Sequence, residues 1–126
     1  EIFGLERGHV LGRLRTDAPD LAMISCDSSG QLVGYVMGRR GQNATQIGPW
    51  IADDPGTADV LLRAVLNAIG DNPVFFDILG VNPDVLPLIS RYGFRHQRPF
   101  VRMYLGPNVY PGRPILQYAI SGVEMG

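Results

Sequence analysis

The sequence predicts an α/β fold, with a mixed, mostly antiparallel twisted sheet, flanking helices and a central β-α-β-α-β section. Strand-like segments joined by turn residues fill the first half of the chain, and helical patterns alternate with apolar strand-like segments in the second half. Hydrophobic residues make up 45% and charged residues 18%, which excludes a disordered chain. The 126 residues are enough for a single domain, residues 1–126, with one core.

The first half of the chain is predicted to form one short helix and three antiparallel strands. Leu5–Leu14 has an amphipathic helical pattern that two glycines weaken. Leu21–Cys26 and Gln31–Arg39 are strand-like, and the residues of Asp27–Gly30 between them favour a tight turn. Ala44–Ala52 follows as a third strand. We therefore expect a three-stranded meander.

The second half is predicted to alternate helices with strands. Gly48-Pro49 interrupts the third strand, and because proline cannot donate to a strand ladder we expect a bulge or an edge there. Ala58–Ile69 has helical spacing, and Pro73–Leu79 is typical of a buried central strand with a parallel neighbour. Asn82–Tyr92 is predicted as a second helix with asparagine as its N-cap, and Phe94–Leu105 as the last long strand.

Composition and charge exclude several classes of protein. The net charge is −1, so no overall field favours nucleic acid or an anionic membrane surface, and we expect neither as a partner. All 11 basic residues are arginine, which excludes chemistry that depends on lysine. The lone Cys26 cannot form an internal disulfide, and we expect a cytoplasmic setting. Because the chain begins with Glu1, we expect it to be the C-terminal part of a longer chain.

Few side chains have a pattern that indicates catalysis. His9 and His96 lack metal-ligand spacing, so we expect no metal. Asp77 lies in an apolar segment and must be hydrogen-bonded or functional, with hydrogen bonding the favoured interpretation. The alternating arginines and aromatic residues of Phe94–Leu105 could border an acidic substrate or a partner, but a solvated strand face is favoured.

The order of elements and several motifs resemble one known family. These motifs are Gly34–Gly41, Gln46–Ala52, Asn82-Pro83 opening a helix that closes at Tyr92–Phe94, Phe100–Pro107 and Tyr118–Gly126. They resemble the GNAT superfamily of acyl-CoA-dependent N-acetyltransferases, from residue 31 to the C-terminus. The similarity is greatest to the C-terminal acetyltransferase-like domain of the YitH/HolE type.

The resemblance implies a cofactor cleft at the break in the third strand, where that strand and Pro73–Leu79 splay apart. It implies that acetyl-CoA is the co-substrate and that an amine of a small molecule or peptide is the acceptor. Backbone groups of Ile47, Gly48 and Trp50 would hold the pantetheine arm, and Asn82 would face the cleft. A bulge at a plain sheet edge, with no ligand, is an equally favoured interpretation. On the ligand interpretation, we expect Gly48→Val to abolish binding at little cost in stability.

Two departures from the family leave an alternative function open. The loop that should bind pyrophosphate, Asp53–Ala58, holds one glycine and repels phosphate through its aspartates. Ile89 stands where the family often has a tyrosine that acts as general acid, and Tyr92 lies on a different helical face, so no catalytic residue is assigned. We expect weak acetyl-CoA binding, with a Kd of ~10 µM to 1 mM. The alternative is a degenerate, non-catalytic GNAT-like module.

The C-terminal tail points to a protein partner. Ile115–Ile120 is apolar, has strand character and could add to the sheet edge of a neighbour. We therefore expect a homodimer or an N-terminal domain as the partner of this chain.

Overall fold

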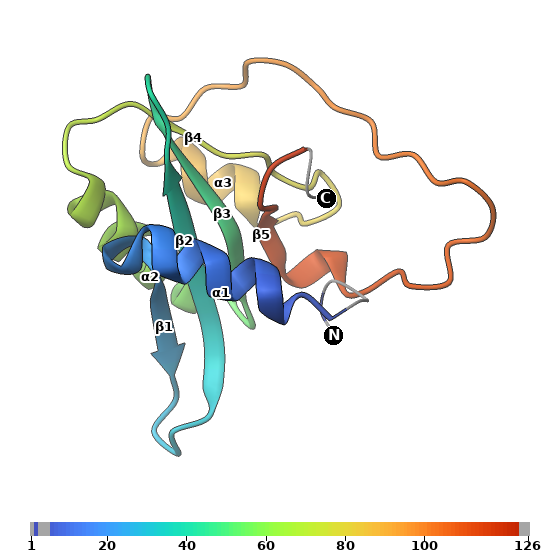
Figure 1. Ribbon diagram of the computed structural model, residues 1–126, viewed down its shortest axis with the longest axis horizontal. Helices are drawn as coiled ribbons and strands as arrows, with labels where there is room; N and C mark the ends of the chain where they lie inside the picture. The colour runs from blue at the N-terminus through green and yellow to red at the C-terminus, as the bar shows by residue number, and fades with distance from the viewer. Residues whose placement is uncertain (1, 3–5, 124–126) are drawn as a thin grey trace.

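The computed structural model describes residues 2 and 6–123, which form one mixed sheet with helices on both faces (Figure 1). Its elements are α1 Gly8–Asp17, η1 Pro19–Leu21, β1 Met23–Cys26, β2 Leu32–Arg40, β3 Thr45–Ala52, α2 Pro55–Ile69, β4 Val74–Phe75, α3 Val85–Ser90, η2 Pro114–Leu116 and β5 Gln117–Ala119. The strand order is β1-β2-β3-β4, and β5 also pairs with β3. The predicted α/β fold is confirmed.

The predicted hairpin is formed by β1 and β2, which pair antiparallel. The Asp27 carboxylate accepts hydrogen bonds from the backbone N–H of Ser29 at 2.8 Å and of Gln31 at 3.0 Å. Gly30 adopts a φ of 84°, a conformation that glycine reaches without strain. The turn chemistry read from the sequence therefore closes this hairpin.

The break predicted in the third strand is present in β3. Val36 of β2 is paired with Trp50 of β3, and Gly38 is paired with Ile47. One residue of β2 therefore lies opposite the two residues Gly48-Pro49 of β3, which form a bulge. The Gly48-Pro49 peptide bond is cis. The bulge changes the course of β3 midway along the strand.

Helix α2 packs directly on the sheet backbone. The Asp54 carboxylate caps its start by accepting the backbone N–H of Thr57 at 2.9 Å, and Gly70 ends it with a φ of 69°. A Cβ built on Gly34 of β2 would lie 2.8 Å from the carbonyl oxygen of Ile51 and 2.9 Å from the Cδ1 of Leu61, so a side chain here would meet both the sheet backbone and α2. Helix α1 lies on the other face of the sheet, in front of β2 (Figure 1).

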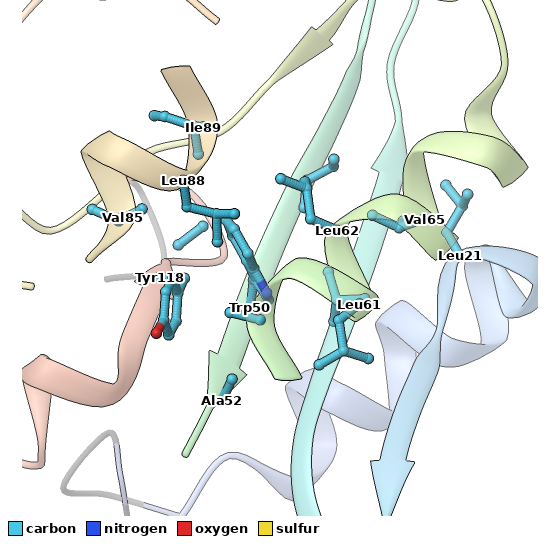
Figure 2. Close-up of a cluster of buried hydrophobic side chains, with 14 of the residues drawn as sticks. Leu21, Trp50, Ala52, Leu61, Leu62, Val65, Val85, Leu88, Ile89 and Tyr118 are labelled. Atoms are coloured by element: carbon cyan, nitrogen blue, oxygen red, sulfur yellow. The ribbon is translucent and has the colours of Figure 1, made fainter. Parts of the chain in front are cut away.

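One hydrophobic core joins α2, the sheet, α3 and the C-terminal strand. Trp50 lies at its centre and is completely buried. Figure 2 shows Trp50 between Leu62 of α2 and Leu88 of α3, with Tyr118 of β5 beside it. Burial of such large side chains is the main stabilising contribution, at about 1.5–3 kcal/mol for each.

The predicted strand Pro73–Leu79 is much shorter in the structure. Only Val74 and Phe75 form β4, which pairs in parallel with Thr45 and Gln46 of β3 as expected. Beyond this point another segment occupies the edge of β3, so no ladder remains for β4 to continue. The predicted parallel pairing is confirmed, but the predicted length is wrong.

All three helices differ from their predicted bounds, and α2 begins three residues before the predicted Ala58. The helix expected over Leu5–Leu14 is α1, Gly8–Asp17, and Leu5 itself lies outside the described residues. The helix expected over Asn82–Tyr92 is regular only in α3, Val85–Ser90, after an irregular first turn. In the part of the chain that the structure describes, no helix is long and apolar enough to cross a membrane.

The prediction of a long strand over Phe94–Leu105 is wrong. The Phe94 N–H donates to the carbonyl of Ile89, and the next hydrogen bond along the described backbone joins Val109 to Pro107. The segment between them has no regular structure and extends away from the sheet as a wide exposed arc (Figure 1). A strand needs a neighbour, and here the alternating pattern has none.

Candidate functional site

The candidate site lies on the edge of β3 that faces away from β2. At its start, this edge pairs with β4 through Thr45 and Gln46. After the bulge at Gly48-Pro49, β3 and the chain that follows β4 no longer pair with each other. The sequence analysis expected the third strand and Pro73–Leu79 to separate near Gly48-Pro49. In the structure their parallel ladder ends after two residue pairs, just before that point. We call the space between the end of β3 and residues 76–78 the β3–β4 groove.

The C-terminal strand β5 fills the β3–β4 groove. It runs antiparallel to β3, with Ala119 opposite Trp50 and Gln117 opposite Ile51. On its other side the N–H of Ile120 donates to the carbonyl of Asp77 at 2.9 Å. The tail was expected to add to the sheet of a neighbour, and that expectation is wrong, because it completes the sheet of its own chain.

Gly48 has direct backbone contact with β5. A Cβ built on Gly48 would lie 1.8 Å from the carbonyl oxygen of Ile120, far inside van der Waals contact. Gly48 also has a φ of 149°, which side chains rarely adopt. The absence of a side chain at the bulge is therefore what lets the Ile120 backbone enter the groove.

Aromatic side chains line the floor of the groove. The rings of Trp50 and Tyr118 lie 4.9 Å apart between centroids, and Phe76 lies 6.1 Å from Trp50. Burial raises the pKa of Tyr118 to about 12, with the Asp84 and Asp54 carboxylates adding to the effect. Tyr118 therefore stays neutral at pH 7 and cannot act as a base there.

Asn82 holds β5 instead of facing an open cleft. Its side chain is buried, and its Nδ2 donates to the carbonyl of Gln117 at 3.2 Å. Its Oδ1 accepts the N–H of Asp84 at 3.0 Å, which organises the turn before α3. The structure thus brings Asn82 next to the same groove as Gly48 and Trp50.

Three buried polar atoms within the described residues have no hydrogen-bond partner, and all three lie at this groove. They are Nε1 of Trp50, Oε1 of Gln117 and Oγ of Ser121. A buried polar atom without a partner typically costs about 1–3 kcal/mol. Two of the three belong to the C-terminal segment, so β5 fits the groove imperfectly.

The start of α2 is organised as an ordinary helix cap. Asp54 accepts the backbone N–H and the hydroxyl of Thr57, at 2.9 and 2.7 Å. These hydrogen bonds, the hydroxyl first, hold the pKa of Asp54 below its usual range. Asp53 is exposed beside it. A phosphate group would therefore meet carboxylates at this helix start, which agrees with the predicted repulsion.

No acid for catalysis is apparent on α3. Ile89 is buried in the core, in keeping with the absence of a proton donor at this position. The hydroxyl of Tyr92 donates to Asp59 of α2, whose carboxylate also lies 3.4 Å from Arg63 and 3.6 Å from Arg91. Burial is the main cause that raises the pKa of Tyr92. Tyr92 therefore ties α3 to α2, away from the groove.

Asp77 and the histidines offer no second site. The Asp77 carboxylate accepts a hydrogen bond from the Gln46 amide at 3.2 Å. The prediction that Asp77 is hydrogen-bonded is therefore confirmed, although its donor is an amide side chain and not a backbone N–H or an arginine. His96 lies in the exposed arc and His9 on α1. Across residues 2 and 6–123 no three His, Cys, Asp or Glu side chains converge as metal ligands.

The structure matches the arrangement that the resemblance implies. It has a parallel β3–β4 pair, a bulge just beyond that pair and a helix on each face of the sheet. A family model described as "Acetyltransferase (GNAT) domain" matches residues 1–119. The chain belongs to this GNAT acetyltransferase family. Membership indicates acetyl transfer as the general class of activity. No curated protein and no solved structure matches the chain significantly.

In the described arrangement of this GNAT domain, β5 lies where the resemblance implies that the pantetheine arm binds. Ile47, Gly48 and Trp50 are brought together with Asn82, but β5 pairs with Trp50 and covers Gly48. In this arrangement the C-terminal strand therefore fills the space beside these four residues.

Sequence reasoning missed the residues that fill the groove. Gln117 and Tyr118 lie in the tail that the sequence analysis assigned to a neighbouring sheet, Ser121 lies just beyond that tail, and none of the three was predicted as part of the site. The available signal was the apolar, strand-like pattern of Ile115–Ile120. That pattern alone does not identify which sheet edge receives the strand.

Proposed function

We propose that this GNAT domain transfers an acetyl group from acetyl-CoA to an amine of a small molecule or peptide. The observation that carries the proposal is that the β3–β4 ladder ends at Gln46, just before the Gly48-Pro49 bulge where the family resemblance implies that the pantetheine arm binds. The family match over residues 1–119 supports the reaction class.

In this proposal the cofactor site is the β3–β4 groove after β5 has left it. Backbone groups of Ile47, Gly48 and Trp50 then face the pantetheine arm, and Asn82, released from Gln117, faces the same space. No residue is assigned as general acid or base, because Ile89 and Tyr92 are both committed to packing between helices.

The finer assignments follow from the resemblance. We place the domain with the C-terminal acetyltransferase-like domains of the YitH/HolE type, in a longer cytoplasmic protein. The single cysteine, Cys26, is exposed and free, which is typical of a reducing compartment.

A second candidate function is a non-catalytic module that packs on a catalytic domain or on its own copy. The observation that favours it is β5 itself, because a strand that completes the sheet also removes the cofactor site. The carboxylates at the start of α2 favour it as well.

Calorimetric titration of the chain with acetyl-CoA separates the two candidates. We expect a Kd of ~10 µM to 1 mM, because pantetheine contacts contribute while the phosphate site is acidic. Release of the CoA thiol in the presence of an amine panel tests transfer directly. Adenosine 3′,5′-bisphosphate, which lacks the pantetheine arm, is the matched control and should bind much more weakly.

No heat and no thermal shift at millimolar acetyl-CoA, for the natural chain and for a chain with weakened β5, would contradict the proposal. That result would leave the non-catalytic module as the function of this domain.

A further inference from the structure

We propose that β5 and the pantetheine arm of acyl-CoA compete for the β3–β4 groove, so that the C-terminal strand closes the acetyltransferase domain until it is displaced. The inference rests on the proposed function, because it assigns the groove to the acyl-CoA of that reaction. It adds to the function an intramolecular occupant that no resemblance to the family implies.

The first step of the argument is that both occupants need the same backbone edge. β5 pairs with β3 at Trp50 and Ile51, and it reaches across the groove to the Asp77 carbonyl. An extended chain and an extended pantetheine arm both bind a strand edge through its unpaired N–H and C=O groups. The edge cannot serve both at once.

The second step is steric. The carbonyl oxygen of Ile120 lies where a Cβ of Gly48 would be, so the bulge is filled down to the β3 backbone. Tyr118 covers Trp50, with 4.9 Å between ring centroids. A ligand therefore cannot reach the bulge by side-chain movement alone, and the whole segment 117–121 must leave.

The third step is that β5 is held in a way that permits displacement. It has three residues, and the polar side chains of Gln117 and Ser121 each leave one buried oxygen without a hydrogen bond. The short 3-10 helix η2, Pro114–Leu116, directly precedes β5 and can move with it, and residues 95–113 before it contain no helix or strand. They can follow β5 out of the groove without breaking a regular element.

Trp50 provides an optical signal for this movement. It is the only tryptophan of the sequence, and it is completely buried, with β5 opposite its backbone and Tyr118 on its ring. Departure of β5 exposes the indole and shifts its emission to longer wavelength. The signal reports the position of β5 whether or not acetyl transfer occurs.

A reversible crosslink tests the competition in the whole 126-residue chain. Ile51→Cys with Gln117→Cys places two thiols on directly opposed residues of an antiparallel pair, a spacing that suits a disulfide. Cys26→Ser removes the natural thiol. The matched control carries Gln117→Cys and Cys26→Ser only and cannot form the intramolecular disulfide.

Acetyl-CoA is titrated into the oxidised and reduced forms, with Kd and Trp50 emission as readouts. We expect the oxidised form to bind at least about ten-fold more weakly than the reduced form, because only molecules with β5 displaced can bind. Red-shifted emission on binding should occur only in the reduced form. The control should bind equally with and without reductant.

Equal acetyl-CoA affinity in the oxidised and reduced forms would overturn the inference while leaving the proposed function intact. Tighter acetyl-CoA binding by the reduced form, with no release of the CoA thiol in the presence of any amine, would support the inference and count against the proposed reaction. Absence of acetyl-CoA binding in both forms would overturn both, since no acyl-CoA site would then lie beneath β5.

A second variant guards against a crosslink that fails to fold. Ile120→Pro removes the N–H that donates to Asp77, which weakens β5 and should tighten acetyl-CoA binding. Leu105→Pro, at a fully exposed position in the arc, is its control and should bind like the natural chain. Unchanged or weaker binding by a folded Ile120→Pro chain would contradict the inference.

Discussion

At the scale of single residues, Gly48 determines whether β5 can enter the groove. Its backbone lies against the Ile120 carbonyl, and its φ of 149° is outside the range that side chains usually adopt. The expectation that Gly48→Val costs little stability is therefore wrong, because the added side chain would meet backbone atoms that cannot rotate away.

Gly48→Ala should destabilise the fold by more than about 2 kcal/mol, from backbone strain and from lost β5 packing. Urea denaturation followed by Trp50 emission measures the change. Gly12→Ala is the matched control, because Gly12 lies in α1 with open space around it. This substitution should raise the free energy of unfolding by up to about 1 kcal/mol. Equal stability of Gly48→Ala and the natural chain would contradict the described contact with Ile120.

At the scale of elements, two C-terminal segments have strand-like patterns but only one joins the sheet. Phe94–Leu105 is the longer and more regular pattern, yet Gln117–Ala119 forms the strand. The arginines of the longer segment explain the outcome, because a charged side chain buried in the groove would cost several kcal/mol. Gln117–Ala119 carries no charged side chain and fits between Trp50 and Asp77 without that cost.

The exposed arc should be the first site of limited proteolysis. Trypsin should cleave the bond after Arg102 earlier than the bond after Arg63. Arg102 lies in irregular chain, whereas Arg63 lies in α2 and is paired with Asp59. Mass spectrometry of early digests identifies the bonds. The fragment that begins at Met103 should stay bound through β5. Early cleavage after Arg63 would instead indicate that α2 opens first.

At the scale of the whole molecule, the arc leaves apolar side chains in solvent. Val101, Met103 and Leu105 are 81%, 85% and 104% exposed, at alternating positions of the same segment. A run of exposed apolar residues is typical of a surface that another protein covers. Because the C-terminal tail pairs within its own chain, we now base the expectation of a homodimer or an N-terminal partner domain on this exposed surface.

Light scattering during size exclusion should give a mass twice that of the chain. Val101→Asp with Leu105→Asp should return the monomer, because two carboxylates would oppose association at this surface. The Trp50 emission of the variant should match that of the natural chain, as both positions lie outside the core. A natural chain that runs as a monomer at every concentration would exclude the homodimer and leave the N-terminal domain.

Local sequence signals determined much of the sheet and its helices. Asp27 and Gly30 closed the hairpin, Asp54 and Gly70 bounded α2, and Gly48-Pro49 marked the bulge. Each of these acts through its own backbone or a neighbour within a few residues, so a pattern in the sequence is sufficient to find it. The same signals placed the candidate groove beside the bulge.

Only the tertiary structure decided what fills that groove. Pairing between Ala119 and Trp50 joins residues far apart in sequence, and it competes with every other strand-like segment for one edge of β3. The outcome depends on Gly48 lacking a side chain, on Asn82 reaching Gln117 and on which segment can be buried without leaving a charge unpaired. Such a comparison of whole packings is not encoded in the periodicity of any one segment, which is why the sequence alone predicted an open cleft and a tail that joins the sheet of a neighbour.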